Sequence, residues 1–373
     1  MRVVICGGGV IGAACAYALS TRGVDVTIIE RWRVGGCASG KSGGFLARDW
    51  CDGTPVASLA QRSFDLHEHW ADDLGNTYGY RKVETFSTAI SARRPLSAGS
   101  DVNMAAWLAH DAALRRQLGD HTTTAQLDPE AFTKALVDAS VARGAELRIA
   151  AVAELARSPD GSQATGIVLE GGEHVAGDAV ILALGPWSLL AAQWIQLAPI
   201  YGLKGHSIVF RPKSLLPAEA IFAEFEDHDG DVLTPEIVPR ADGTLYICGL
   251  SGTGALPVDP SLVEPEAGGC ERLREIAVRI VPQLADADIL AEQACYRPVT
   301  ADGMPLIGPA SDLEGVYIAT GHSVWGMLNA PGTGEALADV LTSGLTSQVD
   351  LTPFAPSRLS PLDPSDLELR ARA

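Results

Sequence analysis

The first thirty residues constrain the fold of this chain most strongly, because they place glycines, a helical pattern and an acid in one fixed order. The apolar run Arg2 to Cys6 precedes glycines at the spacing G-x-G-x-x-G, and a second apolar run, Val24 to Ile29, follows. Short apolar runs are typical of buried parallel strands, and apolar residues at helical spacing between them indicate a helix. The segment therefore predicts a strand–helix–strand unit that binds a dinucleotide.

Each glycine of this unit has a predicted role. Gly7 allows the tight turn, Gly9 lets a pyrophosphate approach the backbone, and Gly12 lets the helix pack closely on the strand. The N-terminus of the helix offers unpaired N–H groups and partial positive charge to phosphates, which makes Val10 and Ile11 candidate contacts.

The second apolar run ends at an acid, Glu30, which is placed to accept hydrogen bonds from an adenosine ribose. Its charge disfavours a ribose 2′-phosphate, although Arg31 follows it as a further candidate contact. The motif by itself fits FAD and NAD equally.

Composition excludes several classes of partner. The formal net charge is −18, so we do not expect binding to nucleic acid, which depends on clustered Lys and Arg. The seven cysteines are odd in number and contain no C-x-x-C pair, which argues against a disulfide framework and a zinc site. We expect no bound metal and a cytoplasmic location. The longest apolar stretch, Ala179 to Ile195, is interrupted by Gly185-Pro186, so no membrane span is expected.

The middle of the chain changes character near Ile200. Before it, Gly177 to Gly185 is an apolar strand whose end would face the ligand. After it, alternating runs divided by turns predict antiparallel strands, with one helix from Val263 to Val281. An earlier helix, Pro55 to Leu74, carries His67 and His69, which point to different sides; we expect a solvated face and no metal site there.

Three segments together resemble the D-amino-acid oxidase family of FAD enzymes, which contains glycine oxidase and monomeric sarcosine oxidase. They are CGGGVIGAACAYAL with VTIIER, ACYRPVTADGMPLIG, and VYIATGHSVWGMLNAPGTGEALADVL, in matching order over nearly the full chain. The resemblance implies an α/β fold with a Rossmann-type FAD-binding domain, built on a mostly parallel sheet, and an antiparallel-sheet α+β substrate domain. The FAD-binding domain would comprise residues 1–80, 126–199 and 296–373, and the substrate domain residues 81–125 and 200–295.

The resemblance also implies further contacts with FAD. The glycine-dense loop before the last helix has an anion-favouring geometry that suits the pyrimidine edge of a flavin. Beyond the first segment, the implied cofactor contacts are Ser39, Lys41, Ser42, Gly43, Gly44, Val152, Gly185, Cys295, Gly321, Ser323, Gly326, Met327 and Leu328. Cys295 stands where sarcosine oxidases bond a cysteine to the flavin. It is therefore either a covalent attachment point or a small buried cysteine, the commoner fate of lone cysteines.

Three residues are candidates for the substrate site. Arg297 stands where glycine oxidase keeps an arginine that pairs with the substrate carboxylate, and a planar guanidinium can hold a carboxylate by two parallel hydrogen bonds. The alternative is a structural ion pair in a loop. Glu236 replaces a tyrosine of glycine oxidase; facing the cavity it would favour an ammonium, and facing solvent it is only a strand charge. Trp325 either walls the pocket or packs in the core.

We therefore predict an FAD-dependent oxidoreductase acting on C–N bonds, specifically an oxidase of a small amine or amino acid. Glycine, an N-alkyl glycine or a D-amino acid would pass hydride from Cα to flavin N5, giving an imine, and molecular oxygen would reoxidise the flavin. The alternatives are a flavin dehydrogenase for a larger specialised amine, an NAD-dependent dehydrogenase, and a non-catalytic flavin-binding protein.

Overall fold

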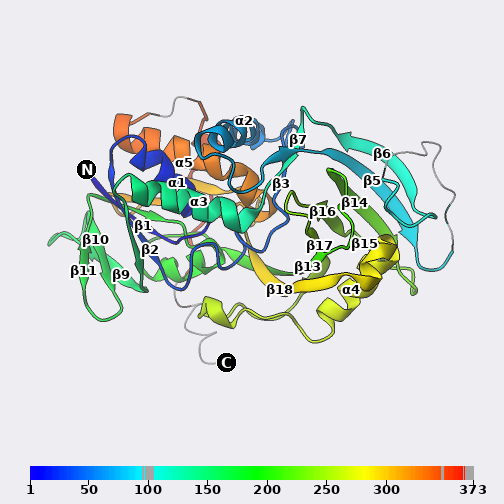
Figure 1. Ribbon diagram of the computed structural model, residues 1–373. Helices are drawn as coiled ribbons and strands as arrows, with labels where there is room; N and C mark the ends of the chain where they lie inside the picture. Colours follow the sequence, from blue (N-terminus) through cyan, green and yellow to red (C-terminus); the bar gives the residue numbers. More distant parts are fainter. Residues whose placement is uncertain (95, 97–104, 346–347, 364, 366–373) are drawn as a thin grey trace.

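Two large sheets carry the fold of the computed structural model, which describes residues 1–94, 96, 105–345, 348–363 and 365 (Figure 1). The first is six-stranded, in the order β19-β20-β12-β1-β2-β8, and every neighbouring pair is parallel except β19 with β20. Its strands are β1 (Arg2–Cys6), β2 (Asp25–Glu30), β8 (Glu146–Ile149), β12 (Ala179–Leu182), β19 (Leu306–Pro309) and β20 (Val316–Thr320).

Alternation along β1 explains what covers the two faces of this sheet. Val3 and Ile5 are buried in one apolar cluster with the helices, while Val4 and Cys6 are buried in a second cluster on the other face. The helices are α1 (Val10–Ser20), α2 (Ala57–Asp73), α3 (Pro129–Ala142) and α5 (Gly326–Ser343), which group on one face in Figure 1. The other face packs on the three-stranded sheet of β9 (Val152–Arg157), β10 (Ala164–Leu169) and β11 (His174–Ala176).

The second large sheet is mostly antiparallel and eight-stranded, in the order β18-β13-β17-β16-β14-β5-β6, with β15 paired to β14. Its strands are β5 (Glu84–Ser91), β6 (Ala113–Gly119), β13 (Tyr201–Arg211), β14 (Glu219–Glu226), β15 (Val232–Leu233), β16 (Glu236–Pro239), β17 (Leu245–Gly252) and β18 (Asp288–Val299). One face packs on α4 (Gly269–Ile280) through a cluster that includes Ile221, Ile237 and Ile247. The residues next to these in sequence point to the opposite face.

Smaller elements complete the chain. A three-stranded sheet joins β3 (Phe45–Ala47), β7 (Thr124–Gln126) and β4 (Arg81–Lys82). Short 3₁₀ helices are η1 (Gly185–Gln193), η2 (Pro260–Leu262), η3 (Pro282–Asp286), η4 (Ser323–Trp325), η5 (Thr352–Phe354) and η6 (Pro356–Arg358). Within the described ranges, no helix combines the length and apolar character needed to cross a lipid bilayer.

Two details of the sequence-based expectations are wrong. The helix expected from Val263 begins only at Gly269, because Gly268 adopts a left-handed backbone with φ 78° that interrupts any earlier helix. His67 does not face solvent: it is 0% exposed on the buried side of α2, and only His69 lies on the solvated side. The expected boundary between residues 295 and 296 falls inside β18, so the division into domains remains a prediction.

Candidate functional site

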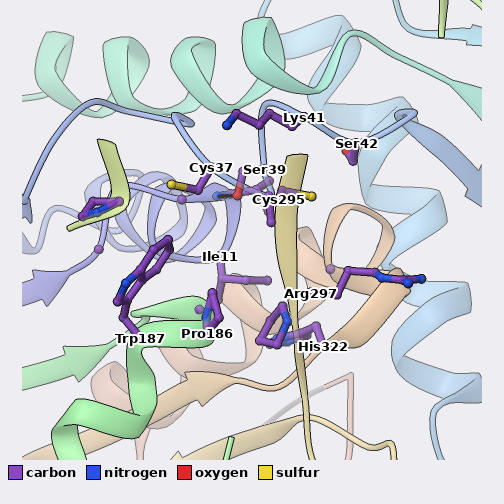
Figure 2. A pocket seen from close by; sticks show the side chains of 18 of the residues that line it. Ile11, Cys37, Ser39, Lys41, Ser42, Pro186, Trp187, Cys295, Arg297 and His322 are labelled. Carbon is purple, nitrogen blue, oxygen red and sulfur yellow. Dashed lines mark hydrogen bonds between the residues drawn. The ribbon is translucent and has the colours of Figure 1, made fainter. Parts of the chain in front are cut away.

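A cavity of about 660 Å³ lies between the two large sheets. On one side it is lined by the residues that follow the carboxyl ends of β1, β2, β12 and β20, where ligands bind in parallel α/β sheets. On the other side it is lined by the face of the eight-stranded sheet that does not pack on α4. Figure 2 shows Cys37 and Trp187 toward one end of this cavity, Arg297 toward the other, and Cys295 between them.

Most of the residues expected from the sequence line this cavity. They are Gly7, Gly9, Val10, Ile11, Glu30, Arg31, Ser39, Lys41, Ser42, Gly43, Gly44, Val152, Gly185, Glu236, Cys295, Arg297, Ser323, Trp325, Gly326 and Met327. Three of the expected cofactor contacts, Gly12, Gly321 and Leu328, are not among its lining residues. Gly321 adopts a left-handed backbone with φ 77° and does not reach the cavity surface. The Leu328 side chain is buried in the core, and the backbone carbonyl oxygen of Leu328 lies 3.2 Å from His67 Nε2.

The glycines of the first segment permit close packing of α1 on β1. A Cβ added at Gly12 would lie 2.0 Å from the carbonyl oxygen of Gly7, so only glycine fits. Gly7 has φ 113°, and a Cβ there would lie 2.3 Å from the carbonyl oxygen of Ala183. These contacts leave the backbone around Gly9 open to the cavity.

Glu30 holds the turn in shape from the end of β2. Its carboxylate accepts hydrogen bonds from the backbone N–H groups of Gly8 (2.7 Å) and Trp32 (2.9 Å). Burial raises the pKa of Glu30, and these backbone donors lower it in part. Arg31, next in sequence, is half exposed, with its guanidinium 3.4 Å from Glu170 at the rim.

The loop between β2 and β3 is fastened to both halves of the cavity. Ser39 Oγ accepts the backbone N–H of Val10 at 2.8 Å, which ties the loop to the start of α1. Lys41 Nζ donates to the carbonyl oxygen of Ala294 at 3.0 Å, and Tyr246 donates to the carbonyl oxygen of Lys41 at 3.2 Å. The loop is thus held against the second sheet by hydrogen bonds that no sequence pattern predicts.

Arg297 enters the cavity from β18, the edge strand of the eight-stranded sheet. Pro298, the residue after Arg297, also lies in β18. A proline is tolerated in an edge strand, because its missing N–H is not needed for a hydrogen bond on the open side of the sheet. A Cβ added at Gly205 on the neighbouring β13 would lie 4.0 Å from Arg297 Nη2, so the guanidinium reaches over β13. In the described part of the chain, the Arg297 side chain has no hydrogen bond and no ion pair within 4.0 Å.

Glu236 faces the same cavity from β16. The thiol of Cys248, its partner across the strands, lies 3.8 Å from Glu236 Oε2 and donates to it. Burial raises the pKa of Glu236 above its ordinary value, and the positive charge of Arg297 lowers it in part. The sequence left open whether this carboxyl faces the cavity or solvent, and in the structure it faces the cavity.

Trp325 belongs to a cluster of four aromatic rings at the cavity wall. The Trp50 ring lies edge-on to Phe222 at 4.7 Å and to Trp325 at 6.3 Å, and Phe45 contacts both Trp50 and Phe222. Phe45, Phe222 and Trp325 line the cavity itself. Trp325 therefore both lines the pocket and packs against other rings.

Two buried polar atoms in the cavity lining have no hydrogen-bond partner among the residues that the structure describes, Ser42 Oγ and His322 Nδ1. Such atoms are rare in folded proteins unless a ligand or water meets them. Burial lowers the pKa of His322 to about 3, so its ring is neutral near neutral pH, with Nε2 3.0 Å from Thr333 Oγ1. The glycine turn, Glu30 and these orphan groups fit a long cofactor with a dinucleotide end.

Sequence reasoning missed several lining residues. His322 is one of them, and its position between Gly321 and Gly326 is a signal in the sequence that could have pointed to it. Tyr246 and Cys248 share one face of β17, Ser207 on β13 is the register partner of Cys248, and Phe222 on β14 is the register partner of Glu236. The alternation of side chains along these strands can be predicted from the sequence, but the sequence does not show which face of the sheet lines the cavity. Across the described ranges, no three His, Cys, Asp or Glu side chains lie together in a way that would hold a metal ion.

The chain has recognisable relatives among known proteins. The model of a family described as FAD dependent oxidoreductase matches residues 2–340. A glycine oxidase of Pseudomonas aeruginosa is 28% identical, over 95% of this chain and 98% of its own length. A Schizosaccharomyces pombe protein, whose name gives an oxidoreductase without a substrate, is also 28% identical, over 94% and 96%. The crystal structure of glycine oxidase from Geobacillus kaustophilus superimposes with a TM-score of 0.81 at 26% identity, covering 96% of this chain and 99% of that one.

Proposed function

The chain belongs to the family of FAD-dependent oxidoreductases, and we propose that this member is an oxidase of a small amine that carries a carboxylate, such as glycine, an N-alkyl glycine or a D-amino acid. Its fold is the mixed α/β arrangement of a Rossmann-type FAD-binding sheet and an antiparallel sheet found in glycine oxidase. Glycine oxidases recur among its matched relatives, which supports an amino-acid substrate.

One observation carries the proposal. Arg297 presents a guanidinium to the cavity without a carboxylate partner among the residues that the structure describes. Arg297 is half-buried, and an unpaired charge that is partly removed from water is costly, so this arginine is suited to receive an anion from outside the protein. A guanidinium binds a carboxylate through two parallel hydrogen bonds, which fixes the orientation of the rest of the ligand.

FAD would lie along the other parts of the cavity lining. The residues that would hold it are Gly7, Gly9, Val10 and Ile11 at the start of α1, Glu30, the loop from Ser39 to Gly44, Val152, Gly185, and the turn from Ser323 to Met327. When bound, FAD supplies the two-electron acceptor for a hydride from the carbon that bears the substrate nitrogen, so that the substrate becomes an imine.

The protein itself contributes orientation and exclusion of water. Arg297 fixes the carboxylate, and orientation of a reacting group supplies much of the rate enhancement in such reactions. The rings of Phe222 and Trp325 keep the neighbouring wall apolar. The reacting amine must be neutral so that its lone pair assists departure of the hydride, and Arg297 opposes positive charge nearby. We propose molecular oxygen as the final electron acceptor.

Cys295 lies in the cavity lining between the loop and Arg297. Burial raises the pKa of its thiol, and the positive charges of Lys41 and Arg297 lower it in part. A thiol is a poor nucleophile compared with its thiolate. We therefore propose that FAD is held without a covalent bond and that Cys295 is a small lining residue.

An anaerobic titration tests the proposed activity. The FAD-loaded protein is mixed with glycine, sarcosine, D-alanine, D-lysine and the amines that lack the carboxylate of each, and the absorbance of the oxidised flavin is followed. At least one carboxylate-bearing amine should bleach the flavin at least tenfold faster than its counterpart, and air should restore the colour. Bleaching by the plain amines at equal rates, or by none of the panel, would contradict the proposal.

A further inference from the structure

The end of the cavity near Arg297 holds a second charged group that the proposed reaction does not use. Glu236 points into the cavity from β16, and its only hydrogen-bond partner in the described ranges is the thiol of Cys248. No Lys, Arg or His of those ranges lies within 4.0 Å of its carboxylate. A carboxyl group that faces a cavity and has no cation in direct contact is a position that a positive charge of a ligand can fill.

Aromatic rings stand beside this carboxyl. Phe222 on β14 is the register partner of Glu236 on β16, and both side chains face the cavity. Trp50 joins Phe222 to Trp325, which forms the next part of the wall. The faces of aromatic rings attract ammonium groups, and more strongly where water is excluded. The carboxyl group of Glu236 and the aromatic rings thus attract the same kind of ligand, an organic cation.

The sheet geometry separates this position from the carboxylate anchor. The Arg297 guanidinium reaches over β13 at Gly205, and β17 lies between β13 and β16. The backbones of β13 and β16 are two strand spacings apart, ~10 Å, so the two side chains stand over different strands of the sheet. The residues between are small, Ser207 and Cys248, and both line the cavity. A flexible carbon chain can therefore lie across the sheet from Arg297 to Glu236.

We propose that Glu236, Phe222 and Trp325 form a subsite for a second, protonated nitrogen of the substrate, so that the substrate is an amino acid with a basic side chain. This inference rests on the proposed function, in which Arg297 binds the carboxylate. The reacting nitrogen is a different one, because it must be neutral, whereas a neighbouring carboxylate favours the protonated form of an amine. The subsite selects chain length as well as charge.

Pairs of simple ligands test the subsite by binding alone. Butyrate, valerate and caproate each carry a carboxylate; γ-aminobutyrate, δ-aminovalerate and ε-aminocaproate add a terminal ammonium. Affinities for the FAD-loaded protein are measured by calorimetry and by the change in the flavin spectrum. At least one amino ligand should bind tenfold or more tightly than its matched alkanoate. Equal affinities for all three pairs would overturn the proposal.

Two variants identify the residue responsible. In Glu236→Gln the advantage of the amino ligand should vanish, while the alkanoates bind at least as tightly as to the wild type. Glu236→Asp keeps the charge on a side chain shorter by one carbon, so the preferred amino ligand should become a longer one. A Gln variant that binds FAD and retains the full preference would refute the assignment.

The Arg297→Ala variant separates failure of this subsite from failure of the proposed function. If alkanoates bind the wild type but not this variant, the carboxylate anchor stands, whatever the amino ligands do. If the variant binds alkanoates as tightly as the wild type, the proposed function itself is contradicted.

Discussion

The side-chain nitrogen of Lys41 donates a hydrogen bond to the backbone carbonyl oxygen of Ala294 across 3.0 Å. The bond joins the loop that would surround the cofactor to the strand that carries Cys295, one residue after Ala294, and Arg297, three residues after it. Burial lowers the pKa of Lys41, and the neighbouring thiols of Cys37 and Cys295 raise it in part. The position of the loop and the position of the carboxylate anchor are therefore linked.

Replacing this lysine tests the link. Lys41→Met removes a hydrogen bond from a charged donor, which is worth about 1.5–3 kcal/mol. We expect FAD affinity to fall by ~10-fold to 100-fold, as measured by quenching of flavin fluorescence on titration of the apoprotein. Lys134→Met is the control, because Lys134 pairs with Glu130 on the exposed side of α3. Equal FAD affinity in both variants would show that the bond does not position the loop.

Gly12 should tolerate no side chain. In Gly12→Ala the new methyl group would lie 2.0 Å from the carbonyl oxygen of Gly7, so α1 must move away from β1. Overpacking of this kind costs about 1–3 kcal/mol, and the shift would also disturb the turn that faces the cavity. Thermal unfolding and FAD content should both fall.

The matched control for Gly12 is Gly23→Ala. Gly23 has φ 71° and open space around it, so alanine there suffers only the backbone strain of a left-handed residue, about 1–2 kcal/mol. It should keep its FAD. A Gly12 variant with full FAD content would mean that the close approach of α1 and β1 is not needed for the cofactor.

His67 should make the protein sensitive to acid. Burial lowers its pKa from 6.5 to about 4, and its Nε2 lies 3.0 Å from the carbonyl oxygen of Met327. Below pH 6.5 the His67 ring is protonated in the unfolded chain, whereas in the folded protein it stays neutral down to about pH 4. The free energy of unfolding therefore falls as the pH is lowered across this interval. One such proton corresponds to about 1.4 kcal/mol per pH unit.

Urea unfolding at pH 7 and pH 5 measures the effect of His67. His67→Gln keeps a donor but cannot be protonated, so its free energy of unfolding should fall less steeply with pH than that of the wild type. His69→Gln alters an exposed ring on the same helix and should leave the slope unchanged. Identical slopes in all three proteins would contradict the buried neutral state of His67.

Acid precipitation tests the absence of a covalent bond at Cys295. The flavin should pass entirely into the supernatant, since the raised pKa of the half-buried Cys295 thiol favours its protonated form. Cys295→Ser should bind the same amount of FAD. A yellow pellet from the wild type together with a colourless pellet from the Ser variant would establish the thioether instead.

The sequence was sufficient for the dinucleotide-binding unit because its determinants are local. Gly7, Gly12 and Glu30 act through contacts within one strand–helix–strand segment, and their spacing alone predicts the turn. The same holds for the N-terminus of α3, where Asp128 accepts the N–H of Ala131 at 2.8 Å ahead of Pro129. Local hydrogen bonds and turns can be read directly from residue order.

The substrate end could not be read in the same way, because strand register decides it. Glu236, Cys248 and Ser207 come from three strands, and only the pairing of those strands places their side chains side by side. The bond from Lys41 to Ala294 spans 253 positions in the chain. The buried position of His67 cannot be predicted from its own helix, because that helix gives no sign that the carbonyl oxygens of Met327 and Leu328 in α5 lie against it.

The most direct measurement compares flavin reduction in the wild type and in Arg297→Ala, both loaded with FAD. The fastest carboxylate-bearing amine of the panel and its counterpart without the carboxylate are mixed anaerobically with each protein in a stopped-flow instrument. In the wild type the acid should react on the order of a hundredfold faster than its counterpart, and in the variant the two should react at similar rates. A variant that binds FAD and still prefers the acid a hundredfold would contradict the account.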